Sequence, residues 1–134
     1  MSFFASTDQL YACTRLLFER LQEQDPTAAD TFLAARLLIR FRCRQPAAEI
    51  TLNGRRRPLE TIFGSTTLRP DVEVELAADT LHQIMLGQLS LKKAVGNGQL
   101  KARGPLYKTL ALTDLFYRGQ ALYPQVLREQ GIGA

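Results

Sequence analysis

The side chains that could carry nucleophilic or metal chemistry are few and widely spaced in this chain. There is one histidine, His82, and there are two cysteines, Cys13 and Cys43. A zinc site needs three or four protein ligands, and no Cys-x-x-Cys pair is present to begin one. A nucleophilic dyad or triad would have to use His82, which its helical neighbours place on a polar helix face as a solvated surface histidine. These residues indicate neither a metal site nor a catalytic centre.

Two glutamates offer the remaining possibility of acid–base chemistry. Glu73 and Glu75 lie on one face of a predicted strand, as the carboxylates of a general acid–base pair would. The same sheet face is predicted to carry arginines, and cross-strand Arg–Glu pairs explain both glutamates without catalysis. The glycines of residues 96–104, GNGQLKARG, lead into a strand, so no helix N-terminus is offered there to a phosphate. We therefore predict no cofactor and no enzymatic activity.

Arginines form the most prominent charged pattern of the chain. They alternate with apolar residues over positions 36–44 and recur as the run Arg55–Arg56–Arg57. Such a surface could attract nucleic acid or an anionic membrane. The pattern lacks the interleaved aromatic side chains on which single-strand binders stack bases. We expect a solvated charged sheet face, a charged hairpin tip that hinders edge pairing, and no nucleic-acid partner.

Length and composition are typical of a globular domain. The 134 residues predict a single domain that spans positions 1–134. The net charge of +4 is only mildly basic, so it does not require an anionic partner. No apolar run approaches the ~18 residues that cross a bilayer, and the N-terminus does not have the basic and apolar regions of a signal peptide. We expect a cytoplasmic protein whose two cysteines are buried and reduced.

Apolar residues recur at helical spacing in several segments. The clearest stripe consists of Leu10, Cys13, Leu17 and Leu21. Pro124 fits the first position of a separate helix at the C-terminal end, since proline is favoured there. Helices are predicted over about 7–24, 79–86, 90–95, 107–117 and 124–130.

Other segments alternate with a period of two, which is typical of half-buried strands. Leu37, Ile39, Phe41 and Cys43 alternate with mostly arginine neighbours, and Asn53–Gly54 is a strong hairpin signal. Strands are predicted over about 36–44, 49–53, 59–63, 71–76 and 99–103.

These elements predict an α+β fold. Helices with an apolar stripe must bury it, so they should cover the apolar face of the sheet. We expect a five-stranded mixed or antiparallel sheet covered on one face by four or five helices, with its sheet-and-helix core over about 34–118. The other face of the sheet should be solvated.

The stretch Asp71–Pro105 carries a family resemblance. In it a strand, DVEVEL, runs into a helix that ends in the turn MLGQL, and a second short helix leads to the strand of GNGQLKARG. This order, with the hairpin at Asn53–Gly54, resembles the sterol carrier protein 2 (SCP2) family of lipid-binding domains over roughly Ala34–Phe116. The matching residues are Val72, Val74, Leu81, Met85, Leu86, Gly87, Leu89, Ala94, Gly98, Leu100, Lys101 and Gly104.

The resemblance implies a non-catalytic lipid-binding protein of a small, stand-alone bacterial type. Its apolar tunnel, between the sheet and the helices, would hold a fatty acyl, acyl-CoA, isoprenoid or sterol-like ligand and present it to a membrane surface or an enzyme. Apolar burial alone discriminates poorly between such ligands. The candidate lining residues are Phe32, Ile84, Met85, Leu106, Leu110, Leu115 and Phe116.

Two alternatives remain at this point. The candidate lining residues could form an ordinary packed core, because a tunnel wall and a core use the same residue types. The chain could also be an interaction or accessory module, for example of ubiquinone or other lipid biosynthesis, that docks onto an enzyme or a second copy of itself and keeps only a vestigial cavity.

Overall fold

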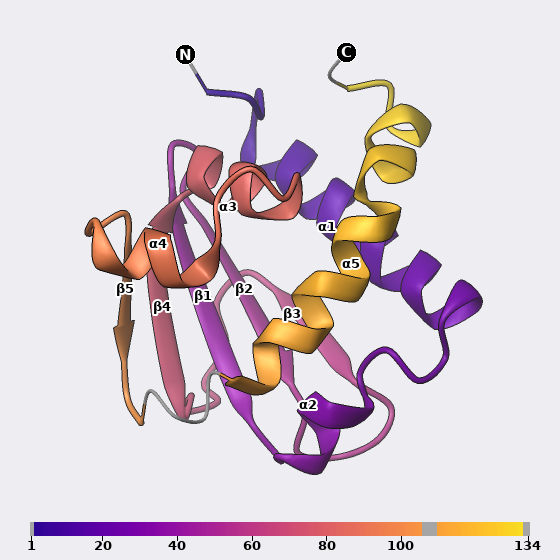
Figure 1. Ribbon diagram of the computed structural model, residues 1–134, viewed down its shortest axis with the longest axis vertical. Coiled ribbons are helices and arrows are strands. Elements are labelled where there is room, and N and C mark those ends of the chain that lie inside the picture. The colour runs from indigo at the N-terminus through magenta and orange to yellow at the C-terminus, as the bar shows by residue number, and fades with distance from the viewer. Residues whose placement is uncertain (1, 106–109, 133–134) are drawn as a thin grey trace.

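The structure is a computed structural model that describes residues 2–105 and 110–132. Five helices and five strands lie in these residues, and the predicted α+β architecture is confirmed (Figure 1). In chain order they are α1 (Thr7–Gln24), α2 (Asp30–Ala34), β1 (Leu38–Arg44), β2 (Ala48–Asn53), β3 (Glu60–Phe63), β4 (Val72–Ala77), α3 (Ala78–Met85), α4 (Leu91–Gly96), β5 (Leu100–Arg103) and α5 (Leu110–Glu129).

The strands form one mixed sheet in the order β3-β2-β1-β4-β5. All neighbouring pairs are antiparallel except β1 and β4, which run parallel. The parallel pair follows from the connection over residues 64–71, because the chain leaves the edge strand β3 and must pass β2 and β1 before it reaches the position of β4. The alternating apolar residues of β1 and β4 then come together on the inner face, where Phe41 lies opposite Val74.

The connection over residues 64–71 also covers part of the outer sheet face, which corrects the expectation that this face is solvated. Arg40 donates hydrogen bonds to the carbonyl oxygens of Thr66 and Leu68, at 3.5 and 2.5 Å. As a result the side chains of Arg40 and Glu73 are only 15% and 17% exposed, and Thr51 is fully buried. The crossing connection is a consequence of strand order, which the alternation pattern does not contain.

The cross-strand pairs predicted for the glutamates are confirmed for one of them. Arg42 approaches Glu73 at 3.4 Å and Glu49 at 3.6 Å, and Arg40 lies 3.7 Å from Glu73. Glu73 is therefore held by two guanidinium groups from the neighbouring strand, and Glu75 faces Arg42 and Lys101 in the strand register.

The hairpin between β2 and β3 is confirmed, but Gly54 serves another purpose than a tight turn. The connection runs over residues 54–59, and Gly54 does not adopt a positive φ. A Cβ atom on Gly54 would lie 2.7 Å from the ring of Phe32 and 2.9 Å from the carbonyl oxygen of Leu37. Glycine is required here because α2 and the start of β1 approach the backbone closely.

The helices lie on the inner side of the sheet, with α1 packed beside α5. Figure 1 shows α5 crossing in front of the strands, with α3 and α4 beside it on the same side. The predicted stop after α3 is confirmed, since Gly87 has a φ of 76°, and the amides of Gly87 and Gln88 bond to the carbonyls of Ile84 and Gln83. Ser90 caps α4 through a 3.0 Å bond from the amide of Lys93.

The expectation of a separate helix from Pro124 is wrong, because α5 continues through that residue. Proline removes one backbone hydrogen bond from a helix interior, so the packing of this helix must outweigh the loss. The buried positions keep helical spacing across the proline, which lets one apolar stripe face the core without interruption. These positions are Leu112, Leu115, Phe116, Gly119, Tyr123, Val126 and Leu127.

Candidate functional site

A small apolar cavity lies at the centre of the molecule, between the inner sheet face and α5. Its volume is about 50 Å³, so it holds about as much as one or a few water molecules. Within residues 2–105 and 110–132, Cys13 and Tyr123 are the only lining residues with a titratable side chain, and burial raises the pKa of both groups, to about 11 for Cys13. Its lining comes from α1 (Leu10, Cys13, Thr14, Leu17, Phe18, Leu21), the sheet (Phe41, Ile50, Leu52), α3 (Leu81, Met85), α5 (Leu115, Phe116, Gly119, Tyr123) and Phe4.

The raised pKa values of Cys13 and Tyr123 determine the charge state of the cavity lining. Both groups are neutral near neutral pH, because burial disfavours the thiolate and the phenolate. The second thiol, Cys43, is also buried, and its pKa is raised to about 12. A thiol in this state is a poor nucleophile. The cavity therefore offers an uncharged apolar environment rather than a reactive one.

A wide groove opens on one side of the central cavity, and we call it the α1–β3 groove. It has a volume of about 840 Å³ and runs between the second half of α1, the chain from Asp25 to Leu33, and β3 with the connection before it. Its floor is apolar, with Phe18, Leu59 and Phe63 among its residues. Its rim is charged, and the guanidinium carbon of Arg15 lies 4.6 Å from the centroid of the Phe63 ring.

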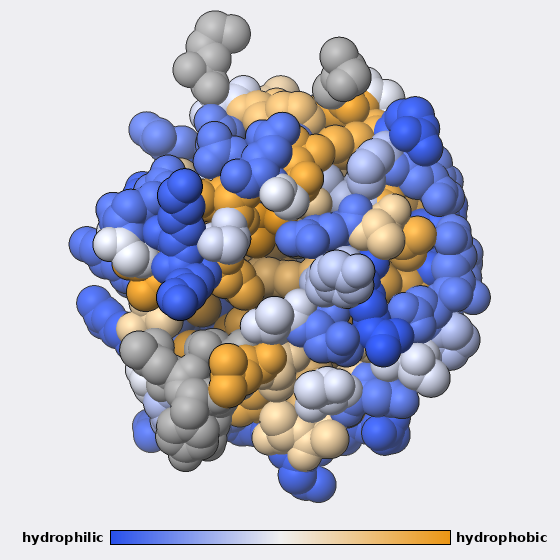
Figure 2. Space-filling view, viewed as in Figure 1, coloured by the Kyte–Doolittle hydropathy of each residue, from blue (hydrophilic) through white to orange (hydrophobic). Residues whose placement is uncertain are grey.

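A second opening lies on the other side of the central cavity, and we call it the α4–α5 hollow. Its volume is about 360 Å³, and among the described residues Lys92 and Thr113 are the only polar ones that line it. The apolar lining comes from the sheet, from α4 and from the first turn of α5, where Leu110 is 73% exposed. Figure 2 shows hydrophobic residues at the floor of a depression on this face, surrounded by hydrophilic side chains.

The central cavity adjoins both of the larger spaces. Phe18, Leu21 and Leu115 line both the α1–β3 groove and the central cavity. Phe41 lines both the central cavity and the α4–α5 hollow, and its ring centroid lies 5.8 Å from that of Phe116. Only a few side chains therefore separate two openings of ligand size from a narrow centre.

The narrow centre sets a condition on any ligand. A cavity of about 50 Å³ cannot enclose an acyl chain, whereas pockets for small molecules measure roughly 300–1,000 Å³. A ligand that passes through the centre must therefore displace side chains such as Met85 and Phe116, or move α5 away from the sheet. Methionine suits such a position, because its unbranched side chain adapts to different shapes.

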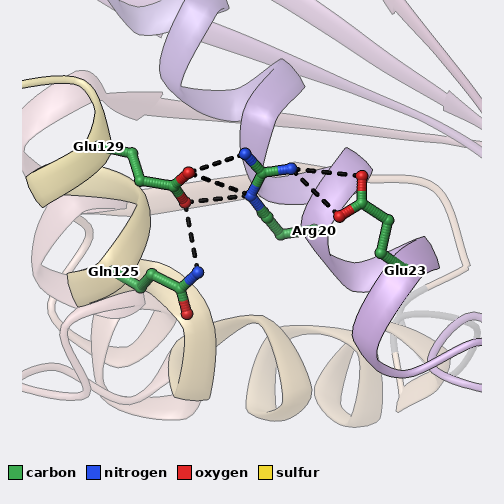
Figure 3. Close-up of polar contacts among 4 residues, drawn as sticks. All are labelled: Arg20, Glu23, Gln125 and Glu129. Atoms are coloured by element: carbon green, nitrogen blue, oxygen red, sulfur yellow. Dashed lines mark hydrogen bonds and ion pairs between the residues drawn. The ribbon is translucent and has the colours of Figure 1, made fainter.

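Polar contacts fasten α5 along its length. At its C-terminal end, Arg20 of α1 bonds to Glu129 at 2.7 Å and pairs with Glu23 at 3.1 Å, while Gln125 also donates to Glu129 (Figure 3). The hydrogen bond with Glu129 raises the pKa of Arg20, and the same contact lowers the pKa of Glu129. Exposed pairs of this kind contribute little to stability, so they guide the position of α5 rather than lock it.

Two further contacts hold the middle and the first half of α5. Arg118 bonds to both carboxylate oxygens of Asp25 at 3.0 Å and to Asp114 at 3.1 Å. Gln120 donates a 2.9 Å bond to the carbonyl oxygen of Ile84 at the end of α3. The first turn of α5 makes no ion pair with the rest of the described chain, and Leu110 lies there.

His82 is not the solvated surface histidine that the sequence predicts. Its ring stacks on Phe3, with the centroids 3.6 Å apart, and its Nδ1 atom shares a 2.7 Å hydrogen bond with the hydroxyl of Tyr123. The amide of Phe3 in turn donates to Asp79 at 2.8 Å. Burial lowers the pKa of His82, and Asp79 opposes this shift. The prediction was wrong because residues 3 and 123, far away in the sequence, cover the polar face of α3.

The seven predicted lining residues fall into separate environments. Met85, Leu115 and Phe116 line the central cavity, and Leu110 lines the α4–α5 hollow. Phe32 and Ile84 are buried in the core and line none of the three spaces. Leu106 lies outside the described residues.

Sequence reasoning missed the contribution of the N-terminal residues to this site. Leu17, Phe18 and Leu21 of α1 line the central cavity, and so does Phe4. The apolar stripe of α1 was visible in the sequence, but its position beside α5 depends on tertiary contacts. Within the described residues no group of His, Cys, Asp and Glu side chains could hold a metal ion. No helix in residues 2–105 and 110–132 combines the length and apolar character needed to span a membrane.

The fold and part of the sequence match known proteins. A model of the SCP-2 sterol transfer family matches residues 18–117. Sterol carrier protein 2 from Yarrowia lipolytica, in its apo form, is similar with a TM-score of 0.64, at 18% identity over 90% of this chain and 95% of that chain. The sterol carrier protein domain 2 of Helicoverpa armigera gives 0.64 at 19% identity, over 80% of this chain and 84% of the other.

A third solved structure with this fold is described as a UbiJ-SCP2 ubiquinone synthesis protein. Its TM-score is 0.61 at 15% identity, over 90% of this chain and 94% of that chain. At these identities the structures show a shared fold. No curated protein sequence matches the chain at a significant level.

Proposed function

The chain belongs to the SCP-2 sterol transfer family, and on this premise we propose that it binds one apolar lipid molecule between the sheet and α5. The protein acts without catalysis, as a carrier that presents the lipid to a membrane or an enzyme. The continuous apolar lining beneath α5, from the α1–β3 groove through the central cavity to the α4–α5 hollow, supports this proposal most directly.

The driving force of the proposed binding is apolar burial. A chain of about sixteen methylene groups gains roughly 0.8 kcal/mol for each group removed from water, or about 12 kcal/mol before the costs of association and ordering. The cavity residues Cys13 and Tyr123 stay neutral, so no buried charge opposes an apolar ligand. Fatty acyl, isoprenoid and sterol-like ligands all satisfy this condition, and a single added methylene changes affinity by only about 1–3 kcal/mol.

The central constriction implies that the ligand opens the site as it enters. Met85 and Phe116 lie at the narrow centre and face the ligand path from α3 and α5. We infer that α5 moves at its first turn, which begins with the exposed Leu110. The contacts of Arg118 with Asp25 and of Glu129 with Arg20 hold the rest of the helix in place. Opening the site costs the same free energy for every ligand, so it lowers every affinity by the same factor. Only a long apolar chain buries enough surface to offset this cost, and the site therefore favours long chains.

A lipid panel followed by thermal unfolding tests the proposal. A ligand that binds only the folded chain adds about 2.7 kcal/mol of stability at a concentration one hundred times its Kd. We expect palmitate or a long isoprenoid alcohol to raise the midpoint of unfolding by several degrees, and short-chain hexanoate to leave it unchanged. Absence of a shift with every long-chain lipid of the panel would reject the carrier function.

A second candidate function is an accessory module that docks onto a lipid-synthesis enzyme. The similarity to the UbiJ-SCP2 ubiquinone synthesis protein favours it, as does the exposure of Leu110, Tyr117 and Val95 on the helical side. Val95 and Leu110 line the same hollow, and exposed large apolar side chains that lie near one another are typical of interaction surfaces. Size-exclusion chromatography separates the two: a stable dimer or complex that Tyr117→Glu disrupts would favour the module, and a monomer that takes up lipid would favour the carrier.

A further inference from the structure

Five arginines gather at the end of the sheet where β1 begins, and we call this surface the arginine pole. It consists of Arg36, Arg55, Arg56, Arg57 and Arg69, and all five side chains are exposed. They come from three separate segments of the chain, so the surface is created by folding rather than by the sequence run at 55–57 alone. In Figure 1 this end of the sheet lies at the bottom, near α2.

Backbone hydrogen bonds tie the three segments together. The amide of Gly54 donates to the carbonyl oxygen of Leu37 at 2.7 Å, and that of Asp71 donates to Leu38 at 2.7 Å. Arg55 then donates to the carbonyl oxygen of Arg69 at 3.2 Å. These bonds hold the residues around positions 36, 55 and 69 side by side, so the cationic surface is built on the ends of β1, β2 and β4.

The positive charge of the arginine pole is only partly compensated. Arg55 pairs with Asp71 at 3.3 Å, and Arg57 pairs with Asp30 at 3.3 Å. Arg36, Arg56 and Arg69 make no ion pair with any residue in the described part of the chain. Three exposed guanidinium groups are therefore available to anions, and each can bind a phosphate oxygen pair in bidentate geometry.

The arginine pole also borders an entrance to the proposed lipid site. Arg57 belongs to both surfaces, because it lines the α1–β3 groove together with Pro58 and Leu59. From there the groove leads past Phe18 and Leu115 to the central cavity. A surface that binds phosphate groups thus lies directly beside an apolar opening. This surface is complementary to a bilayer, which presents phosphate headgroups beside acyl chains.

We propose that the arginine pole docks on an anionic phospholipid bilayer and turns the mouth of the α1–β3 groove toward the membrane. The biological sense of this contact rests on the proposed function, since a lipid carrier must meet the membrane that supplies or receives its ligand. A nucleic acid would also present phosphates, but the three segments that form the pole, residues 35–37, 54–58 and 66–71, contain no aromatic side chain for base stacking, and the adjacent apolar groove would serve no purpose.

Vesicle co-sedimentation tests the docking surface. The wild-type chain and the double variant Arg56→Gln/Arg69→Gln are mixed with vesicles of phosphatidylcholine that contain phosphatidylserine, and with vesicles of phosphatidylcholine alone. Each basic residue near an anionic membrane contributes about a fivefold gain in binding, so the double variant should bind anionic vesicles about thirtyfold more weakly. Added salt should weaken binding of the wild-type chain.

The matched control removes two other exposed cations. Arg44, the last residue of β1, and Lys93 of α4 are exposed and make no ion pair within the described residues. Both lie away from the pole, since β1 runs from the pole toward Arg44 and α4 precedes β5 at the same far end of the strands (Figure 1). The variant Arg44→Gln/Lys93→Gln loses the same net charge and should keep binding within a few-fold of wild type. Circular dichroism of both variants confirms that they are folded.

Three results would overturn the docking proposal. They are equal binding to both kinds of vesicle, equal losses in the two double variants, and tighter binding of the wild-type chain to single-stranded RNA than to anionic vesicles. The palmitate-induced thermal shift keeps this test separate from the carrier function. A double variant that loses vesicle binding but keeps that shift supports the docking surface, whereas vesicle binding by a wild-type chain that takes up no lipid rejects the carrier function alone.

Discussion

Gly119 offers a test in which stability and ligand binding should change in opposite directions. It lies inside α5, where glycine costs roughly 0.5–1 kcal/mol relative to alanine. A Cβ atom at this position would lie 3.2 Å from Cε of Met85, 3.8 Å from Cδ2 of Leu17 and 3.9 Å from Cδ1 of Leu21. The one close neighbour is the end of a flexible side chain, so it can move by a few tenths of an ångström. We predict that Gly119→Ala raises the free energy of unfolding by about 0.4–1 kcal/mol.

The same methyl group should weaken lipid binding, because Gly119 lines the central cavity. That cavity holds only about 50 Å³ and must widen for an acyl chain to pass. Extra methyl groups in a tightly packed space cost about 1–3 kcal/mol, which corresponds to a Kd that is about five- to 150-fold higher. Calorimetric melting of the free protein should rise by about 2–4 °C, while fluorescent fatty-acid titration should show weaker binding.

Gly96 provides the matched control. It is the last residue of α4, and a Cβ atom there would meet nothing within 4 Å. Gly96→Ala should therefore raise stability in the same direction without any effect on lipid affinity. If Gly119→Ala binds palmitate as tightly as the wild-type chain does, the ligand does not pass through the central cavity, and the proposed path beneath α5 is wrong.

Three further changes test other parts of the account. Thr51 Oγ1 is buried without a hydrogen-bond partner among the described residues, so Thr51→Val should raise the free energy of unfolding by about 1 kcal/mol. The control variant Thr14→Val removes a 2.9 Å hydrogen bond to the carbonyl oxygen of Leu10, so it should not raise the free energy of unfolding. Burial lowers the pKa of folded His82, so the unfolded chain binds a proton first as the pH falls. Stability should then decline below about pH 6.5, and His82→Gln should flatten this decline. Leu115→Ala should lower the free energy of unfolding by about 2–5 kcal/mol. Palmitate should stabilise this variant more than it stabilises the wild-type chain, because the α1–β3 groove then opens to the central cavity.

Each of these expectations can fail on its own. A Thr51→Val variant that is less stable than wild type would mean that the hydroxyl is satisfied in solution. An unchanged pH profile in His82→Gln would show that other groups cause the decline. A smaller palmitate effect in Leu115→Ala than in wild type would place the ligand outside the passage that this side chain closes.

The strands were predictable because apolar and polar residues alternate along them in the sequence. In β1, Ile39 and Phe41 point to the helices while Arg40 and Arg42 point away, and this pattern is local to the sequence. The stop of α3 at Gly87 was also local, since a positive φ favours glycine there. Apart from the hairpin at Asn53–Gly54, the neighbours of each strand were not predicted, because period-two patterns do not specify pairing.

The errors have a common cause in contacts between distant residues. Phe3 and Tyr123 cover His82, and the connection at Thr66 and Leu68 covers Arg40. Pro124 was predicted to start a helix because proline favours the first helical position, but the buried apolar stripe of α5 overrides this preference. Tertiary packing decides such cases, and a pattern within ten or twenty residues does not report it.

The candidate site was harder to predict than the fold for a geometric reason. Met85 and Phe116 line the central cavity, whereas Ile84, of the same apolar character, lies in the packed core. Residue type does not separate these positions, because both kinds are buried and apolar. The contribution of Phe18 from α1 became visible only once α1 was placed beside α5.

Native mass spectrometry of the freshly purified protein tests the central claim most directly. We expect a chain that carries one non-covalently bound lipid, or that gains the mass of one palmitate when the fatty acid is added in excess. Gly119→Ala should show a smaller bound fraction at the same palmitate concentration. A spectrum that contains only the free chain, with and without added long-chain lipid, would contradict the claim that the space beneath α5 is a lipid site.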